Sequence, residues 1–233
     1  MDWVKNSEMY QGRENEVSGI ILAGGKGKRL GSPKALIKIG GESLLLRTVN
    51  LLRSLFSEVL VVAGDKGLIP DIPGIVLLQD EVAGMGPIGG LITALKNMKN
   101  ERGFCVACDM PLLDKCLIQY LVSLSNSRET IVPCVAGQIE PLHAIYSRKC
   151  LEIALRRISR RQYSLTGLIL SVSAHCVHIP LGPGALPFFN INTPQDLTLA
   201  EQTCAETEKE RPGKLSVGSK QPGCLVALRE EDL

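Results

Sequence analysis

The sequence contains no long hydrophobic run. No stretch approaches the roughly 20 apolar residues that a membrane-spanning helix needs, so we expect no membrane partner. Residues 1–16 are polar and lack the apolar segment of a secretory signal. Because the eight cysteines therefore have no secretory signal beside them, we expect a reducing compartment and a cytoplasmic location.

The sequence also lacks a strong charge of either sign. It carries 26 Lys and Arg residues against 24 Asp and Glu residues, which gives a formal net charge of +2. An excess this small does not indicate a basic surface for nucleic acid. We therefore expect no nucleic-acid partner.

A full set of zinc ligands is missing as well. Cys105 and Cys108 have C-x-x-C spacing, but no second C-x-x-C or H-x-x-H pair accompanies them. Side chains three residues apart on a strand point to opposite faces, which argues against a zinc or redox role. We interpret both cysteines as small core residues.

The composition is typical of a globular enzyme, with 233 residues, 45% of them hydrophobic and 21% charged. Apolar runs alternate with helix-length segments, and this order predicts crossover connections and a mostly parallel sheet. Strands are predicted at residues 18–23, 58–63, 74–78, 103–108, 175–179 and 188–191. Helices are predicted at residues 42–56, 87–98, 114–124, 148–158, 163–172 and 194 to about 203.

One part of the chain breaks this parallel rhythm. The runs 130–135 and 139–146, joined by Ala136-Gly137-Gln138, predict a hairpin or crossing segment and hence an antiparallel strand. Residues 1–16 are expected to be a flexible leader and residues 204–233 a disordered tail. The predicted architecture is a single three-layer α/β/α domain over residues 17–203.

The most informative stretch is the glycine-rich segment 22–34, which directly follows a β-branched apolar run. Its glycines allow backbone N–H groups to turn inward, as in loops that cradle a phosphate. An anionic polyphosphate would balance four cations in or beside this loop, namely Lys26, Lys28, Arg29 and Lys34. We interpret Arg29 and Lys34 as phosphate ligands. The alternative is a solvated surface cation, which is the better interpretation of Lys26 and Lys28.

Two common glycine-rich motifs do not fit this loop. A P-loop needs glycine where the chain has Leu22 and a hydroxyl residue where it has Arg29. The dinucleotide motif G-x-G-x-x-G has Leu30 in place of its third glycine. Both motifs are therefore excluded.

Two aspartates follow predicted strands and should lie at the same edge of the sheet as the loop. Ligands of open parallel sheets bind beyond the carboxyl ends of the strands, where Asp80 and Asp109 are expected. Asp109 is the candidate Mg²⁺ ligand, because proteins hold Mg²⁺ with one or two carboxylates plus substrate phosphates and water. The alternatives are a helix cap for Asp109 and a turn residue for Asp80.

The pattern Leu-Ala-Gly-Gly-x-x-x-Arg-Leu-Gly-x-x-Lys resembles the signature of the nucleoside-triphosphate transferases. The likeness continues, in the same order as in that superfamily, through Gln79-Asp80, Gly86-Pro87-Ile88-Gly89-Gly90, Cys108-Asp109-Met110-Pro111, Pro141-Leu142-His143-Ala144 and Asn190-Ile191-Asn192-Thr193-Pro194. Over residues 17–203 the chain is most similar to the molybdenum cofactor guanylyltransferases within this superfamily.

The resemblance implies a Rossmann-like nucleotide-diphospho-sugar transferase fold and Mg²⁺-dependent transfer of GMP from GTP to the phosphate of molybdopterin, with release of pyrophosphate. Its implied partners are GTP, molybdopterin, and molybdoenzymes or other proteins of cofactor biosynthesis. The implied nucleotide-binding residues are Leu22, Ala23, Gly24, Gly25, Lys34, Asp80 and Asp109. Those implied in catalysis are Arg29, Lys34 and Asp109, with Asp109 as metal ligand.

Candidate acceptor-binding residues are His143, Asn190 and Asn192. His143 could instead be a packed strand residue, and the two asparagines could cap the last helix. Three functions remain as alternatives: cytidylyl transfer to molybdopterin, guanylyl transfer to another phosphate acceptor such as a corrinoid, and GTP binding without catalysis.

Overall fold

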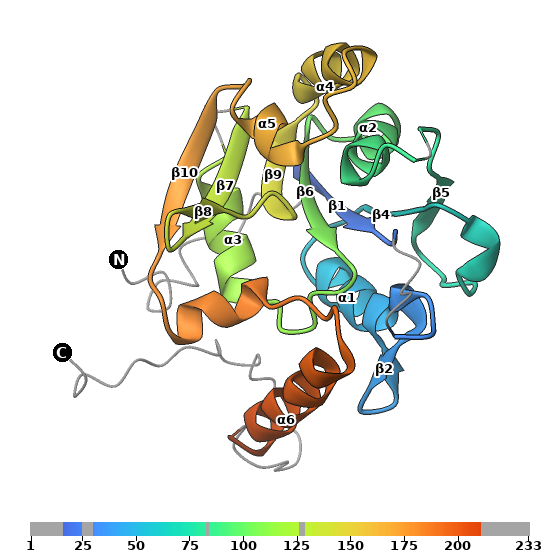
Figure 1. Ribbon diagram of the computed structural model, residues 1–233, viewed down its shortest axis with the longest axis vertical. Helices are drawn as coiled ribbons and strands as arrows, with labels where there is room; N and C mark the ends of the chain where they lie inside the picture. The colour runs from blue at the N-terminus through green and yellow to red at the C-terminus, as the bar shows by residue number, and fades with distance from the viewer. Residues whose placement is uncertain (1–15, 25–29, 83, 126–128, 211–233) are drawn as a thin grey trace.

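The computed structural model describes residues 16–24, 30–82, 84–125 and 129–210 (Figure 1). Its centre is a sheet with the strand order β10-β7-β9-β6-β1-β4-β5, and β8 pairs with β7. The strands are β1 (Val17–Leu22), β4 (Val59–Ala63), β5 (Val76–Gln79), β6 (Arg102–Ala107), β7 (Thr130–Val135), β8 (Gln138–Ile139), β9 (His143–Ser147) and β10 (Ala174–Ile179).

Neighbouring strands of this sheet run parallel except around β9 and β8. β9 is antiparallel to both β6 and β7, and β8 is antiparallel to β7. The prediction of a mostly parallel sheet with an antiparallel strand is therefore confirmed.

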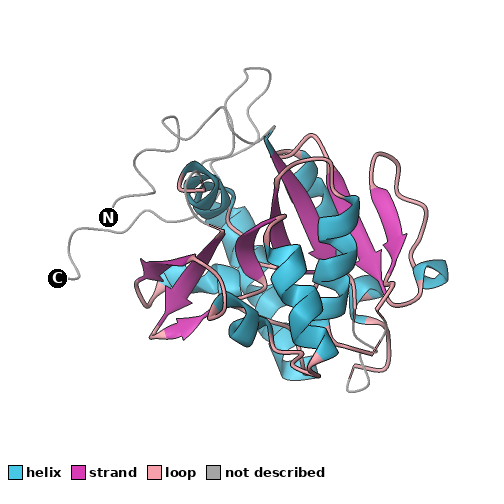
Figure 2. Ribbon diagram, turned by 90° about the horizontal axis from the view of Figure 1, so that it is seen from above, coloured by secondary structure: helices cyan, strands magenta, loops and turns pink. Residues whose placement is uncertain are grey.

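Helices flank the sheet on both faces (Figure 2). Buried residues of α1 and α3 form one core with the sheet, and buried residues of α2, α4 and α5 form a second core on the other face. The α-helices are α1 (Leu44–Arg53), α2 (Pro87–Asn97), α3 (Lys115–Ser123), α4 (Cys150–Ser159), α5 (Leu165–Ile169) and α6 (Pro194–Glu210). The 3₁₀ helices are η3 (Lys34–Leu36), η4 (Lys66–Leu68) and η5 (Pro183–Phe188).

The strand β1 shows why the sequence forms this sandwich. Side chains alternate across a strand, so Ile21 packs in the core with α1 while Ile20 and Leu22 pack in the core with α2. Gly103, on the neighbouring strand β6, leaves room for Ile20, because a Cβ there would lie 2.3 Å from Ile20 Cδ1. β1 is buried along its whole length, as expected for a central parallel strand.

Two helix starts follow ordinary capping chemistry. Ser43 Oγ accepts a hydrogen bond from Leu46 N at 3.2 Å, and Asp114 Oδ1 accepts one from Leu117 N at 2.8 Å. The helix predicted from residue 42 therefore starts at Leu44, because residues 42–43 pair with the preceding ribbon as strand β3 (Glu42–Ser43) against β2 (Lys38–Ile39).

Several predicted elements differ from the structure. The run 139–146 splits into β8 and β9, because Pro141 and Leu142 form a turn that is closed by a hydrogen bond of 3.2 Å from His143 N to Glu140 O. The helix predicted at 163–172 covers only Leu165–Ile169. No strand forms at 188–191, where the described chain leaves η5 as an irregular segment.

The last helix packs against the small ribbon rather than against the main sheet. Ala200 and Cys204 of α6 share a third apolar cluster with Ile39 and Leu44. α6 continues to Glu210, beyond the predicted end near residue 203. None of the helices in the described segments combines the length and the apolar character needed to cross a bilayer.

Candidate active site

The carboxyl ends of four parallel strands lie side by side and position the candidate site. Backbone hydrogen bonds continue the ladders beyond the strands: Ala23 N donates to Val62 O at 2.8 Å, Asp80 N to Ala63 O at 2.8 Å, and Cys108 N to Leu22 O at 3.2 Å. The start of the glycine loop and the residues that follow β4, β5 and β6 are therefore at one edge of the sheet, as the parallel order predicts.

Three side chains from distant parts of the chain meet at this edge. Lys34 Nζ donates to Asp109 Oδ2 at 2.6 Å and to Asn192 Oδ1 at 2.6 Å. The Lys34 and Asp109 side chains are 16% and 15% exposed, so this ion pair is mostly shielded from water. The structure thus brings together two predicted nucleotide ligands and one predicted acceptor ligand.

Local structure around Lys34 fixes the start of its side chain. Lys34 is the first residue of η3, where Leu36 N bonds Pro33 O at 3.0 Å and Ile37 N bonds Lys34 O at 3.2 Å. The next residue, Ala35, is buried in the core beneath α1. This short turn presents Lys34 towards the end of β6.

The segment that carries Asn192 is held from both sides. Ile191 N donates to Asp109 O at 2.9 Å, which ties it to the end of β6. Asp196 Oδ2 accepts from Asn192 N and from Thr193 N, both at 2.8 Å, and Thr193 Oγ1 accepts from Asp196 N at 3.2 Å. The pKa of Asp196 is lowered by these hydrogen bonds, and the backbone N–H of Asn192 makes the largest contribution. Asp196 is thus a capping residue at the start of α6.

The second carboxylate oxygen of Asp109 has no hydrogen-bond partner in the described structure, although it is buried. A buried carboxylate oxygen without a partner is costly, and a cation would satisfy it. The pKa of the neighbouring thiol, Cys108, is raised to about 12, first by burial and then by the negative charge of Asp109. The residues present therefore fit a divalent cation at Asp109.

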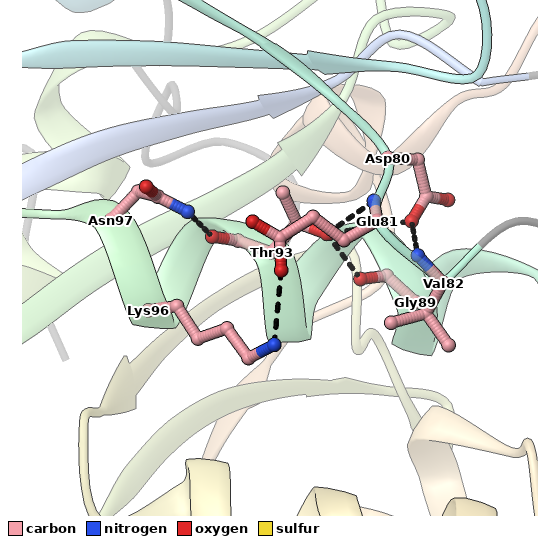
Figure 3. A network of polar contacts seen from close by, with 7 residues as sticks. All are labelled: Asp80, Glu81, Val82, Gly89, Thr93, Lys96 and Asn97. Carbon is pink, nitrogen blue, oxygen red and sulfur yellow. Dashed lines mark hydrogen bonds and ion pairs between the residues drawn. The ribbon is translucent and has the colours of Figure 1, made fainter.

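Asp80 lies in a separate polar network after β5 (Figure 3). Asp80 Oδ1 accepts from Val82 N at 2.9 Å and lies 3.4 Å from Thr93 Oγ1, which also accepts from Glu81 N at 3.0 Å. A Cβ at Gly89 would lie 2.5 Å from Val82 O, so only glycine lets α2 approach this turn. Asp80 thus makes the turn contact that was its alternative interpretation, at the same sheet edge as Asp109.

Sequence reasoning assigned no role to Gln79, the last residue of β5, whose side chain contacts the loop after β4. Its Nε2 donates to Gly64 O, and its Oε1 accepts from Lys66 N at 3.1 Å. The loop after β4 is thereby fixed to the end of β5. The Gln-Asp pair after an apolar strand was visible in the sequence, but its cross-strand partners were not.

His143 does not reach this edge as an exposed ligand. Its side chain is fully buried in β9, with ring centroids 5.1 Å from Phe104 and 4.8 Å from Phe188. Asn190 Nδ2 turns back to Phe188 O at 3.0 Å. The structure therefore places His143 in the core, where it is a packed strand residue, as in its alternative interpretation.

Some predicted residues fall outside the described segments. Gly25, Lys26, Lys28 and Arg29 belong to this group, so their proposed phosphate contacts stay predictions. Cys105 and Cys108 are 0% and 1% exposed, which confirms that they are core residues. Burial raises the pKa of the Cys105 thiol, so it stays neutral.

The chain is similar to a known family and to named relatives. A family described as the MobA-like NTP transferase domain matches residues 19–171. The chain is 35% identical over 196 residues to a probable molybdenum cofactor guanylyltransferase of Chloroflexus aggregans, covering 79% of this chain and 93% of that protein. It is 30% identical over 206 residues to a protein of the same name from Pelotomaculum thermopropionicum, covering 86% and 98%.

A solved structure supports the fold. The crystal structure of molybdopterin-guanine dinucleotide biosynthesis protein A from Archaeoglobus fulgidus superimposes with a TM-score of 0.70 at 23% identity, covering 82% of this chain and 100% of that one. On the strength of the matched domain and the relatives, this chain belongs to the MobA-like NTP transferase family and is a nucleotidyltransferase.

Proposed function

We propose that this protein transfers GMP from GTP to the phosphate of molybdopterin and releases pyrophosphate, with Mg²⁺ as cofactor. The names of the relatives, probable molybdenum cofactor guanylyltransferases, support the choice of GTP and molybdopterin. The observation that carries the proposal is the mostly shielded contact of 2.6 Å between Lys34 and Asp109 at the carboxyl edge of the sheet.

The chemistry needs positive charge and alignment more than it needs a base. An oxygen of the acceptor phosphate attacks the α-phosphorus of GTP, and the bond from that phosphorus to the β-phosphate oxygen breaks. The electron pair leaves with pyrophosphate. Because the acceptor phosphate is already ionised at neutral pH, no strong general base is required. Alignment of the two phosphates and neutralisation of their charge supply the rate.

The side chains at the sheet edge have distinct roles in this proposal. Asp109, which has a buried oxygen without a partner, would hold Mg²⁺, and the metal would neutralise charge on the phosphate oxygens when bound. Lys34 donates to the departing pyrophosphate. The main chain of residues 22–24, at the carboxyl end of β1, lies along the base and ribose. Asp80, next to β4 and β5, contributes to nucleotide binding.

Replacing Asp109 by asparagine tests the metal assignment. Asp109→Asn keeps the side-chain size but removes the charge, so we expect a loss of turnover of about 100-fold or more while the fold is retained. Pyrophosphate release with GTP and molybdopterin measures turnover, and circular dichroism checks the fold. Asp71→Asn, at an exposed position, is the matched control and should be fully active. Near-normal activity of Asp109→Asn would contradict the assignment.

A nucleotide panel tests the choice of base. With molybdopterin as acceptor, pyrophosphate release should be fastest with GTP and slower with CTP, ATP and UTP. A preference for CTP would refute guanylyl transfer in favour of cytidylyl transfer. Binding of GTP without pyrophosphate release from any acceptor would instead indicate a non-catalytic module.

A further inference from the structure

The ammonium group of Lys34 is held by two acceptors of different charge. A lysine ammonium has three N–H donors, and the carboxylate of Asp109 and the amide oxygen of Asn192 occupy two of them, each at 2.6 Å. Among the residues that the structure describes, no third acceptor is bonded, which leaves one donor for a partner such as a phosphate oxygen. The long lysine side chain is thus confined although part of it remains exposed.

The two acceptors cannot play the same part once a cation binds Asp109. A metal ion competes with Lys34 for the negative charge of Asp109, because both cations are attracted to the same carboxylate. Asn192 is neutral, so a metal ion and Lys34 do not compete for a negative charge there. Its amide oxygen can hold the ammonium without cancelling the positive charge that a phosphate would meet.

The structure makes Asn192 a rigid support. Its own backbone N–H is bound by Asp196 Oδ2, and the preceding residue, Ile191, is fully buried and bonded to Asp109 O. The main chain is therefore fixed on both sides of Asn192. A side chain on such a backbone can define the position of a flexible partner at low entropic cost.

We propose that Asn192 is a positioning residue that holds the Lys34 ammonium in place for the nucleotide, rather than a ligand of the acceptor. The inference rests on the proposed function in one respect, namely that Lys34 contacts the phosphates. Asn192 itself touches Lys34 and acts through it.

A double-mutant cycle on GTP affinity separates these two roles. GTP binding is measured by calorimetry for the wild type, Asn192→Ala, Lys34→Ala and the double variant, with and without Mg²⁺. We expect Asn192→Ala to weaken GTP binding about 10-fold, as for loss of a hydrogen bond to a charged group. In the Lys34→Ala background the same substitution should have no further effect, because its target is gone. Asn50→Ala, an exposed asparagine bonded to Glu42, is the matched control and should bind GTP normally.

Two results of this cycle would overturn the proposal. One is an additive loss of GTP affinity in the double variant. The other is an Asn192→Ala protein with normal GTP affinity and a raised KM for molybdopterin, which would return Asn192 to the acceptor side.

A labelling experiment tests the contact without nucleotide or metal. Acetic anhydride is added at limiting concentration, and mass spectrometry gives the acetylation of Lys34 relative to the exposed Lys38 as internal reference. Asn192→Ala should raise this ratio several-fold because Lys34 loses one of its two partners, whereas an unchanged ratio would overturn the proposal. If the wild-type protein failed to transfer GMP, the proposed function would fail while this ratio still decided whether Asn192 holds Lys34.

Discussion

At the scale of single residues, His143 is a titratable side chain that the fold buries completely. His143 is 0% exposed, and neither of its ring nitrogens has a hydrogen-bond partner in the described structure. Burial among apolar groups disfavours the charged imidazolium and lowers the pKa of His143 to about 3. The folded protein therefore keeps this side chain neutral at every physiological pH.

This buried histidine predicts a loss of stability in mild acid. The unfolded chain binds a proton at His143 below its ordinary pKa of about 6.5, and the folded chain does not until about pH 3, so stability falls as pH falls through this window. At pH 5 the free energy of unfolding should be lower by about 2 kcal/mol from this group. Urea unfolding at pH 7.5 and pH 5 measures the difference.

Replacing the histidine isolates its contribution to this pH dependence. His143→Leu should reduce the difference in unfolding free energy between the two pH values by most of that amount, because leucine does not titrate. His178→Gln, at an exposed position of β10, is the matched control. An unchanged pH dependence in His143→Leu would show that other groups dominate acid unfolding.

At the scale of elements, the hairpin between β7 and β8 contains a strained residue. Ala136 has φ of +49° and Gly137 has φ of +79°, and both lie in the two-residue turn that joins Val135 to Gln138. The left-handed region costs a residue with a Cβ roughly 1–2 kcal/mol and costs glycine almost nothing. The turn therefore favours glycine, asparagine or aspartate at a position where this chain has alanine.

A pair of opposite substitutions tests this interpretation. Ala136→Gly should raise the free energy of unfolding by about 0.5–1 kcal/mol, since relief of strain exceeds the extra entropy of the unfolded glycine. Gly137→Ala should lower it by about 1 kcal/mol through the backbone alone, because an added Cβ meets no atom within 4 Å. Chemical denaturation gives both values. A destabilised Ala136→Gly protein would contradict the assignment of strain.

Elements with strong local signals could be predicted from the sequence, and those decided by distant partners could not. Buried runs such as β1, the proline at the start of α2 and the Asp114 cap mark their own positions. Residues 188–191 are apolar enough for a strand, yet Ile191 N bonds Asp109 O instead of a neighbouring strand. Tertiary contacts overrode propensity there.

The same distinction holds for the site. The position of Lys34 and Asp109 at one edge of the sheet could be predicted, because glycine loops and strand ends converge there in parallel sheets. The bond from Lys34 to Asn192 joins residues 158 positions apart, and no local pattern encodes it. His143 shared a motif with candidate ligands, but its burial between two phenylalanines depends on the packed fold.

At the scale of the whole molecule, nucleotide binding should stabilise the fold in a cation-dependent way. A ligand that binds only the folded state adds about 2.7 kcal/mol of stability at a concentration 100-fold above its Kd. We expect GTP to raise Tm more with Mg²⁺ than with EDTA, because Asp109 and the phosphates would share the cation. Differential scanning fluorimetry measures both shifts.

The variant Asp109→Asn provides the decisive comparison for this thermal effect. Its Tm should rise with GTP by a similar amount in Mg²⁺ and in EDTA, since the cation has lost its protein ligand. A wild-type protein whose GTP-induced shift is the same in both conditions would argue against a metal at this edge of the sheet.

The long separation between Lys34 and Asn192 also has a consequence for the newly made chain. Translation delivers Lys34 early, then Asp109, and Asn192 only after every strand of the main sheet has been synthesised. A ribosome-bound chain that stops short of residue 190 would hold all strands of that sheet but not the amide that completes the lysine's surroundings. The hydrogen bond from Lys34 to Asn192 can therefore form only after the segment that follows β10 has been made.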